Sequence, residues 1–241
     1  MEVVTLPYPL LLQKSAREAL GISLKDHVLI IDEAHNLMDA ISNVNSVAIS
    51  HSQLKRSKAL LNIYLQKFRN RLKGKNRIYV VQVVRVIDSL LLFLDRKITD
   101  NRSTEGIVGV SDLTAGKGVD QVNLHKLMRY LSESKLARKV EGYIAYIDNQ
   151  ESGSGSDSRV KNAPVLMSVQ SFFGALSNPS SEGRFFYERT DSGDLVLRYM
   201  LLDPAAHFRE AVEDARSVIL AGGTMSPVRD PEQVFSSLLY C

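Results

Sequence analysis

Cysteine is almost absent from this chain of 241 residues, since the only one is Cys241 at the last position. A single cysteine excludes a disulfide within the chain, and it excludes a cysteine-rich metal site built from this chain alone. The start of the sequence also lacks a charged leader followed by an apolar core and a small-residue cleavage site. We therefore expect no secretory signal.

Long uninterrupted apolar runs are missing as well. The most apolar stretch, Ile78 to Leu94, contains Gln82, Arg85 and Asp88. Polar residues at that density are typical of a buried helix rather than of a membrane span. We expect no membrane association, which leaves the nucleus or the cytoplasm as the compartment.

Acidic residues are absent between His51 and Arg77, a stretch that holds nine lysines and arginines. The whole chain has a net charge of only +3, so the remainder of it is net negative. Apolar residues recur at helical spacing from Leu54 to Leu72, which predicts an amphipathic helix with a basic face. Such a face favours a polyanion such as DNA, although a solvated helix surface explains the same pattern. The candidate DNA-binding residues are Lys55, Arg56, Lys67, Arg69 and Arg71. On the same helix, Tyr64 and Phe68 fall on the apolar stripe, so we expect them in the core rather than stacked on bases.

The phosphate-binding pattern G-x-x-x-x-G-K-[ST] is also lacking. The only Gly-Lys pairs are Gly74-Lys75 and Gly116-Lys117, and neither is followed by serine or threonine. Neither pair follows a convincing strand. The chain therefore has no recognisable cradle for a triphosphate.

What the sequence does contain is the apolar run Val28 to Ile31, followed directly by Asp32, Glu33, Ala34 and His35. A short continuous apolar run predicts a strand buried on both faces of a parallel sheet. We expect the strand to end at Ile31, which leaves both carboxylates on the following turn at the sheet edge where α/β folds bind ligands. One carboxylate there can hold Mg²⁺ and the other can orient an attacking water. The alternative is an acidic helix start with Asp32 as its cap.

A second candidate segment is Gly222-Gly223-Thr224, which follows the predicted strand Ser217 to Ala221. Two glycines allow a close backbone approach to a ligand, and the threonine hydroxyl can bond a neighbouring carboxylate. An ordinary strand-ending turn is the alternative. The functional interpretation gains if this strand lies beside the one that ends in Asp32 and Glu33.

The order of predicted elements indicates an α/β fold interrupted by a mostly helical insertion. A strand within Met1 to Leu6, a helix from Leu10 to Leu20 and a strand from Leu24 to Ile31 form a predicted βαβ unit. Further along we expect a loop over 99–120, a helix over 121–140, a flexible linker over 148–163 and a helix from Pro164 to Leu176. A hairpin over 184–202 and a helix from Pro204 to about Ala215 come before the second candidate segment.

These motifs resemble those of a known family. Asp32 to His35 with Asn36-Leu37 is similar to motif II, or Walker B, of the XPD-like iron–sulfur DEAH-box DNA helicases of superfamily 2. Gly222 to Pro227 is similar to their motif III, and Val3 to Leu12 to the segment before motif II. The resemblance is closest to the chromosome-loss, or sister-chromatid-cohesion, type, and it covers an internal fragment of such a helicase.

The resemblance implies three parts. Residues 1–50 and 191–241 belong to a RecA-like helicase domain 1, and 51–190 form an arch-type insertion. It implies Asp32 as the Mg²⁺ carboxylate, acting through water, and Glu33 as the water-activating catalytic residue. His35, Gly223 and Thr224 couple ATP hydrolysis to DNA movement.

The activity implied is 5′-to-3′ ATP-dependent translocation on single-stranded or forked DNA, in the nucleus. Cohesion or replication-fork proteins are the implied partners, and a [4Fe-4S] cluster is implied for the full-length member, with ligands absent from this chain. The missing phosphate loop predicts that the fragment alone is inactive. A non-catalytic DNA- or protein-binding module from a truncated paralogue, and a fragment that does not fold stably, stay open as alternatives.

Overall fold

The computed structural model describes residues 3–100, 104–116, 118–151, 164–177, 183–202, 208–209 and 212–222. The chain divides into two compact units, of which unit 1 comprises 1–46 and 200–241 and unit 2 comprises 47–199. These borders differ from the expected ones after residues 50 and 190. The reason is that β2 (Val47–Ser50) pairs with β5 (Leu195–Leu201) along a register that reaches Tyr199, so β2 and the paired part of β5 belong to unit 2.

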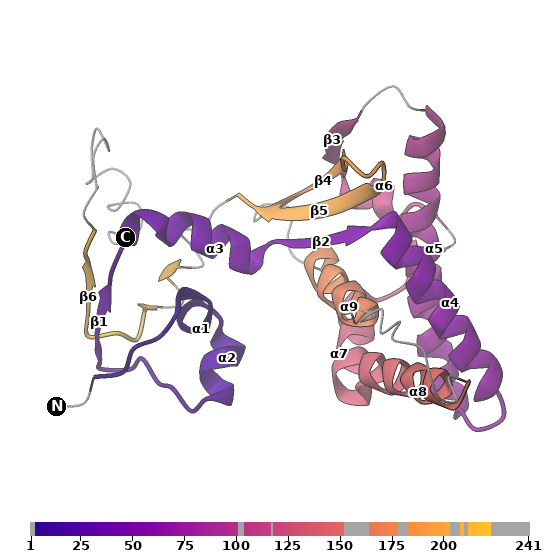
Figure 1. Cartoon of the computed structure of the whole chain (residues 1–241), viewed down its shortest axis with the longest axis horizontal. Coiled ribbons are helices and arrows are strands. Elements are labelled where there is room, and N and C mark those ends of the chain that lie inside the picture. Colours follow the sequence, from indigo (N-terminus) through magenta and orange to yellow (C-terminus); the bar gives the residue numbers. More distant parts are fainter. Residues whose placement is uncertain are drawn as a thin grey trace. The chain divides into compact units, whose positions relative to one another are not determined.

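Unit 1 contains a parallel pair of strands, β1 (Val28–Ile31) and β6 (Ser217–Leu220), which Figure 1 shows side by side. Its helices are α1 (Tyr8–Leu12), α2 (Lys14–Ala19), the 3₁₀ turn η1 (Ala34–Asn36) and α3 (Leu37–Asn45). The expected first βαβ unit is wrong over the described residues, because residues 3–6 form no strand. Val3 and Val4 are exposed, and the parallel partner of β1 comes instead from the far end of the chain. The expected helix from Leu10 to Leu20 is two short helices, and Gly21 follows them in the left-handed region with a φ of 67°.

The β1–β6 pair is covered on one face among the described residues. Ile31 is buried in a cluster with Leu37 and Ile41 of α3. The opposite side is open, since Val28 is 51% and Ile30 is 70% exposed. Successive strand residues point to opposite faces, so helices packed on one side bury only alternate residues. The expected burial of β1 on both faces is therefore wrong for this structure.

Unit 2 has a four-stranded sheet in the order β2-β5-β4-β3, with β3 (Glu105–Val108) and β4 (Gly183–Arg189) antiparallel. The strands β4 and β5 form the expected hairpin. Its turn is closed by a hydrogen bond from the Thr190 N–H to the Asp194 carbonyl, 2.9 Å. Gly193 occupies the left-handed region at φ 82°, which explains a glycine at that corner.

The helices of unit 2 are α4 (His51–Lys67), α5 (Gly74–Asp100), α6 (Val110–Thr114), the 3₁₀ turn η2 (Val119–Gln121), α7 (Leu124–Ser134), α8 (Leu136–Glu151) and α9 (Val165–Leu176). They share one apolar core with the sheet, in which Leu54, Leu90 and Phe172 are fully buried. The loop expected over 99–120 is wrong, because it contains β3, α6 and η2. The single helix expected over 121–140 is broken at Lys135, whose φ is 51°. The helix predicted after Pro164 is confirmed as α9, while most of the expected 148–163 linker lies outside the described residues.

The mixed α/β class is confirmed: a parallel pair of strands lies side by side (Figure 1), and a mostly helical block separates the two strands along the sequence. The expected helix from Pro204 to about Ala215 is largely outside the described residues. No helix in the described ranges is long and apolar enough to cross a membrane.

Candidate functional site

The acidic pair lies on the turn that directly follows β1, as the sequence predicts. Glu33 sits in the left-handed region with a φ of 51°, a conformation that costs a non-glycine residue about 1–2 kcal/mol. The Glu33 N–H donates to Oδ1 of Asp32 at 2.9 Å. This short contact holds the Asp32 carboxylate against the turn and leaves its other oxygen available for a ligand.

Tyr8 stabilises the turn from α1. Its hydroxyl donates to the carbonyl oxygen of Asp32 at 2.5 Å and lies 3.1 Å from the carbonyl oxygen of Glu33. Burial raises the pKa of the Tyr8 phenol above its usual 10.0, and the charges of Asp32 and Glu33 raise it further. Tyr8 therefore remains protonated and able to donate at neutral pH. No spacing rule in the sequence singles out this tyrosine, and sequence reasoning assigned it no role in the site.

The second candidate segment begins beside this turn. The Ala221 N–H donates to the Ile31 carbonyl at 2.8 Å, and the Ala34 N–H donates to the Ala221 carbonyl at 2.8 Å. The parallel ladder thus continues one step beyond β6, and Gly222 follows at the same sheet edge as Asp32. Gly223 and Thr224 lie outside the described residues, so their expected coupling role stays a prediction.

The side chains of the turn are open to solvent. Asp32, Glu33 and His35 are exposed, whereas Ala34 between them is buried. Nδ1 of His35 lies 3.2 Å from Oε2 of Glu33, so the histidine orients one oxygen of that carboxylate. An exposed carboxylate with a free oxygen suits Mg²⁺ bound largely through water and phosphate oxygens. No group of three His, Cys, Asp or Glu side chains gathers to hold a metal in the ranges the structure describes.

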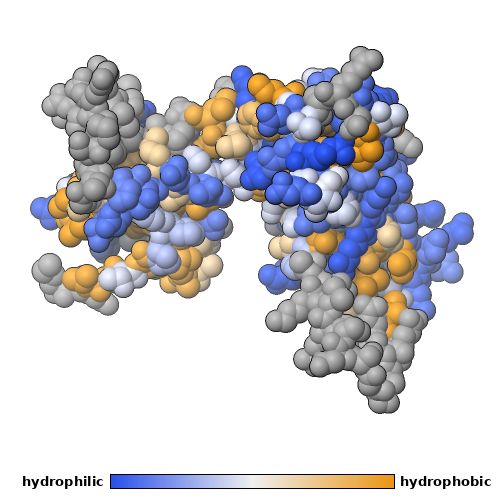
Figure 2. Space-filling model, turned by 45° about the horizontal axis from the view of Figure 1, so that its top comes forward, coloured by the Kyte–Doolittle hydropathy of each residue, from blue (hydrophilic) through white to orange (hydrophobic). Residues whose placement is uncertain are grey.

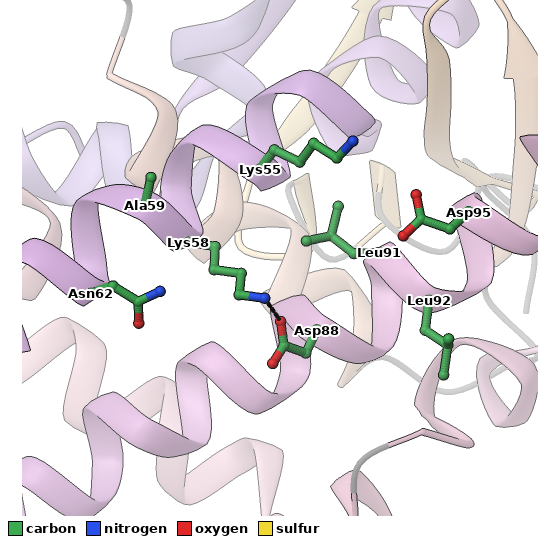
Figure 3. Close-up of a pocket in the computed structure, with 8 residues that line it drawn as sticks. All are labelled: Lys55, Lys58, Ala59, Asn62, Asp88, Leu91, Leu92 and Asp95. Atoms are coloured by element: carbon green, nitrogen blue, oxygen red, sulfur yellow. Dashed lines mark ion pairs between the residues drawn. The ribbon is translucent and has the colours of Figure 1, made fainter.

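The basic residues between His51 and Arg77 divide into two sets. Lys55 lines a cavity of about 440 Å³ between α4 and α5. Figure 3 shows that Asp88 and Asp95 line the same cavity and that Lys58 reaches across to Asp88, 2.7 Å away. Two carboxylates beside two lysines weaken the attraction of this half of α4 for a phosphate backbone.

The second set lies where α4 ends and α5 begins. Lys67, Arg69 and Arg71 are exposed and form no ion pair within the described part of the chain. The neighbouring Tyr64 packs against the core and its ring lies 4.7 Å from that of Phe68. The expectation that Tyr64 belongs to the core is confirmed. Of the predicted DNA-binding residues, the three at this junction have the more favourable electrostatic setting, while Arg56 is half-buried on α4.

His51, to which sequence reasoning gave no role, begins α4 in a polar network. Nε2 of His51 lies 2.8 Å from Oδ1 of Asp95. Ser50 and Gln53 form a capping box, a signal that the S-x-x-Q spacing carries in the sequence. Ser52 donates to Asp194 at 2.6 Å and so ties the start of the helix to the β4–β5 turn. This network is structural, and it lies in a different unit from the acidic turn.

Comparison with known proteins agrees with this architecture. Residues 1–54 match the family model DEAD_2. The solved structure of Xpd4 from S. tokodaii superimposes with a TM-score of 0.50 and 19% identity, covering 90% of this chain and 39% of that one. The chain thus shares its fold with part of that structure, and the residues up to and including the acidic turn resemble the DEAD_2 family.

Proteins of similar sequence make this resemblance more specific. The chain is 57% identical to the ATP-dependent DNA helicase CHL1 of Coccidioides immitis over 98% of this chain. It is 57% identical to that of Aspergillus clavatus over 95% of this chain, and 42% identical to that of Schizosaccharomyces pombe over 99%. It spans 27%, 31% and 30% of those proteins, respectively. By sequence the chain is thus similar to a segment of these CHL1 helicases, and it spans less than a third of their length.

Proposed function

We propose that this chain is part of the motor of an ATP-dependent helicase that moves 5′-to-3′ along single-stranded or forked DNA. The observation that supports it best is the ladder from Ile31 through Ala221 to Ala34, which delivers the acidic turn and Gly222 to one sheet edge. Similarity to CHL1 helicases along nearly the whole chain supports the same activity. We further propose a nuclear role in chromosome cohesion or genome maintenance, with cohesion or replication-fork proteins as partners.

Within this motor, each residue of the turn has its own task. Asp32 holds Mg²⁺ through water, and the metal supplies charge neutralisation at the β- and γ-phosphates of ATP when both are bound. Glu33 orients and deprotonates the attacking water, since its carboxylate is exposed and only its Oε2 is in contact with His35. His35 contacts Glu33 and transmits its position, and Gly223 and Thr224 complete the coupling between ATP and DNA.

The unit 2 segment, residues 47–199, serves as the arch-type part and contributes to the DNA path. The residues that contact DNA are Lys67, Arg69 and Arg71. Lys55 is a secondary contact because acidic neighbours reduce its attraction for phosphate, and Arg56 is secondary because it is half-buried. The iron–sulfur cluster of the family belongs to the longer protein, because this chain holds one cysteine and a four-cysteine cluster needs four.

The activity of the motor is tested in a longer protein that contains this segment and a phosphate loop. Glu33→Gln keeps the size of the side chain and removes its charge, so DNA-stimulated ATP turnover should fall by at least two orders of magnitude, the range of a lost general base. Glu18→Gln, on α2 of the same unit, is the matched control and should retain turnover. Normal turnover in Glu33→Gln would overturn the catalytic assignment.

The chain of 241 residues alone should show no ATP turnover, because its sequence has no phosphate-loop pattern G-x-x-x-x-G-K-[ST] to hold the triphosphate. ATP turnover by this chain that disappears in Glu33→Gln would refute the claim that the chain alone is catalytically inactive.

A binding module without catalysis is the second candidate function, favoured by the exposed cations at the α4–α5 junction. Charge reversal at Lys67, Arg69 and Arg71 should then abolish salt-sensitive binding to single strands, and unchanged binding would exclude this surface.

A further inference from the structure

A second cavity of unit 2 differs in chemistry from the one shown in Figure 3. It has a volume of about 230 Å³ and lies between the start of α5, the turn η2 and the start of α7. Seven residues line it: Lys75, Ile78, Tyr79, Gln82, Gln121, Asn123 and Lys126. This set, named here the α5–α7 niche, contains two cations, three amides and two apolar or aromatic side chains, and it contains no carboxylate.

The polar groups of the niche are available to a ligand. Lys75 and Lys126 are exposed, and neither forms an ion pair in the described ranges. Oδ1 of Asn123 accepts a hydrogen bond from the backbone N–H of Lys126 at 2.9 Å. The side-chain amide nitrogen of Asn123 therefore stays available as a donor. The side chain of Gln82 is half-buried and makes no hydrogen bond to the described residues. Free ammonium groups suit a phosphate, and free amides suit the mixed donors and acceptors of a base edge.

The apolar part of the niche suits a planar ring. Ile78 is 60% exposed although it lies on α5, a helix with a long buried face. Tyr79 is held in place because its ring stacks on that of Tyr130, with centroids 4.4 Å apart and planes 14° apart. The niche is smaller than the roughly 300–1,000 Å³ typical of drug-sized ligands, which favours one ring over a larger molecule.

The surroundings favour a chain of phosphates over a lone anion. Lys73 and Arg77, two residues before and after Lys75 in the sequence, are exposed and continue the basic run from Lys67. Inorganic phosphate would engage the lysines and leave Ile78 and the amides unused. Figure 2 shows hydrophilic residues over much of the drawn face, with smaller hydrophobic patches between them.

We propose that the α5–α7 niche binds one unpaired nucleotide of a single-stranded nucleic acid. Lys75 and Lys126 contact its phosphate, the base packs on Ile78 and the edge of Tyr79, and Gln82, Gln121 and Asn123 bond the base edge. A duplex cannot use the niche, because its bases are stacked and paired inside the helix. The inference rests on the proposed function for the choice of nucleic acid, and it adds a base-reading site to the phosphate contacts proposed above.

The test uses the whole chain and two fluorescein-labelled strands of equal length, an oligothymidine and the same backbone without bases. Fluorescence anisotropy should show about tenfold tighter binding of the strand with bases, since contacts to one base are worth about 1–3 kcal/mol. Ile78→Ala and Gln82→Ala should each reduce that preference several-fold. Ile63→Ala, an exposed isoleucine of α4 outside the niche, is the matched control and should keep the preference.

The phosphate contacts are tested by salt dependence. Lys75→Ala combined with Lys126→Ala should lower the slope of log affinity against log salt by about 0.7, the contribution of one neutralised phosphate of a single strand. Lys139→Ala, an exposed lysine of α8, should leave the slope unchanged.

Equal affinity of the native chain for both strands would overturn the proposal that the α5–α7 niche binds a nucleotide. An unchanged salt slope in the double variant would also overturn it. Competition by polyglutamate as strong as that by oligothymidine would also overturn it, in favour of an acidic protein partner. The proposed motor fails on different evidence, namely ATP turnover that persists in Glu33→Gln, so the two proposals can be separated.

Discussion

Replacing Tyr8 by phenylalanine tests how the acidic turn is held. The change removes the hydroxyl that donates to the Asp32 carbonyl and lies within reach of the Glu33 carbonyl, and it keeps the ring that packs on the unit 1 core. One hydroxyl carries one proton, so the loss equals about one hydrogen bond. We expect the free energy of unfolding of unit 1 to fall by about 1 kcal/mol at neutral pH.

The pH dependence gives this prediction a second, independent readout. The pKa of Tyr8 is raised by burial and by the charges of Asp32 and Glu33. The stabilisation is therefore fully present below the unfolded value of 10.0 and is lost as the pH rises through the higher folded value. The difference in stability between the native chain and Tyr8→Phe should be constant near neutral pH and shrink above pH 10. Comparing the two proteins removes the contribution of the other tyrosines.

The assay is hydrogen exchange by mass spectrometry on peptides covering 28–37, combined with urea unfolding followed by circular dichroism. A loss of about 1 kcal/mol corresponds to roughly fivefold faster exchange for amides that open with the turn. Tyr143→Phe, a change in unit 2 that keeps the ring contact with Phe68, is the control and should not alter the exchange rate of these peptides. Unchanged exchange in Tyr8→Phe, or an alkaline loss of stability equal to that of the native chain, would refute the role given to Tyr8.

Two further changes test unit 2. Gly183→Ala would place a methyl group into the buried ring of Tyr199, so we expect a loss of about 1–3 kcal/mol in thermal or urea unfolding, and Gly142→Ala, in open space on α8, should cause no such loss. Burial raises the pKa of Asp194, but hydrogen bonds from Ser52 and Ser50 and the His51 charge outweigh it and hold that pKa below its usual 3.8. Asp194→Ala should thus cost about 1 kcal/mol at neutral pH, and the difference from the native chain should disappear as the pH falls through the lowered pKa of Asp194. A difference that persists in acid would show that packing, not the carboxylate, is responsible.

Part of the architecture follows from local patterns. The four apolar residues before Asp32 are enough to predict a strand that ends at Ile31, and the structure confirms that end. Pro164 before an apolar run, and Asp191 to Asp194 between two alternating stretches, likewise predict α9 and the β4–β5 hairpin. These signals succeed because helix starts and tight turns are decided by a few neighbouring residues.

The errors arise where a distant segment decides the outcome. The residues of β3 lie in a stretch rich in Gly, Ser and Thr, which reads as a loop, yet β4 supplies the hydrogen bonds that make it a strand. Lys135 is an ordinary helix former, and the left-handed conformation that separates α7 from α8 has no marker at that position. The predicted βαβ unit joins β1 to a strand within Met1 to Leu6, whereas the structure pairs β1 with β6 from the far end of the chain.

For the candidate site, the sequence alone determined the chemistry: two adjacent carboxylates and a histidine after a strand, with a glycine-rich segment after another strand. Tertiary structure alone decided that β6 lies beside β1, that Tyr8 anchors the acidic turn, and that Lys55 faces two aspartates while the residues of the α5–α7 niche face none. The physical reason is that side-chain type and local backbone preference are encoded within a few residues. Hydrogen bonds between strands and the charges around a lysine depend instead on which remote segments the fold brings together.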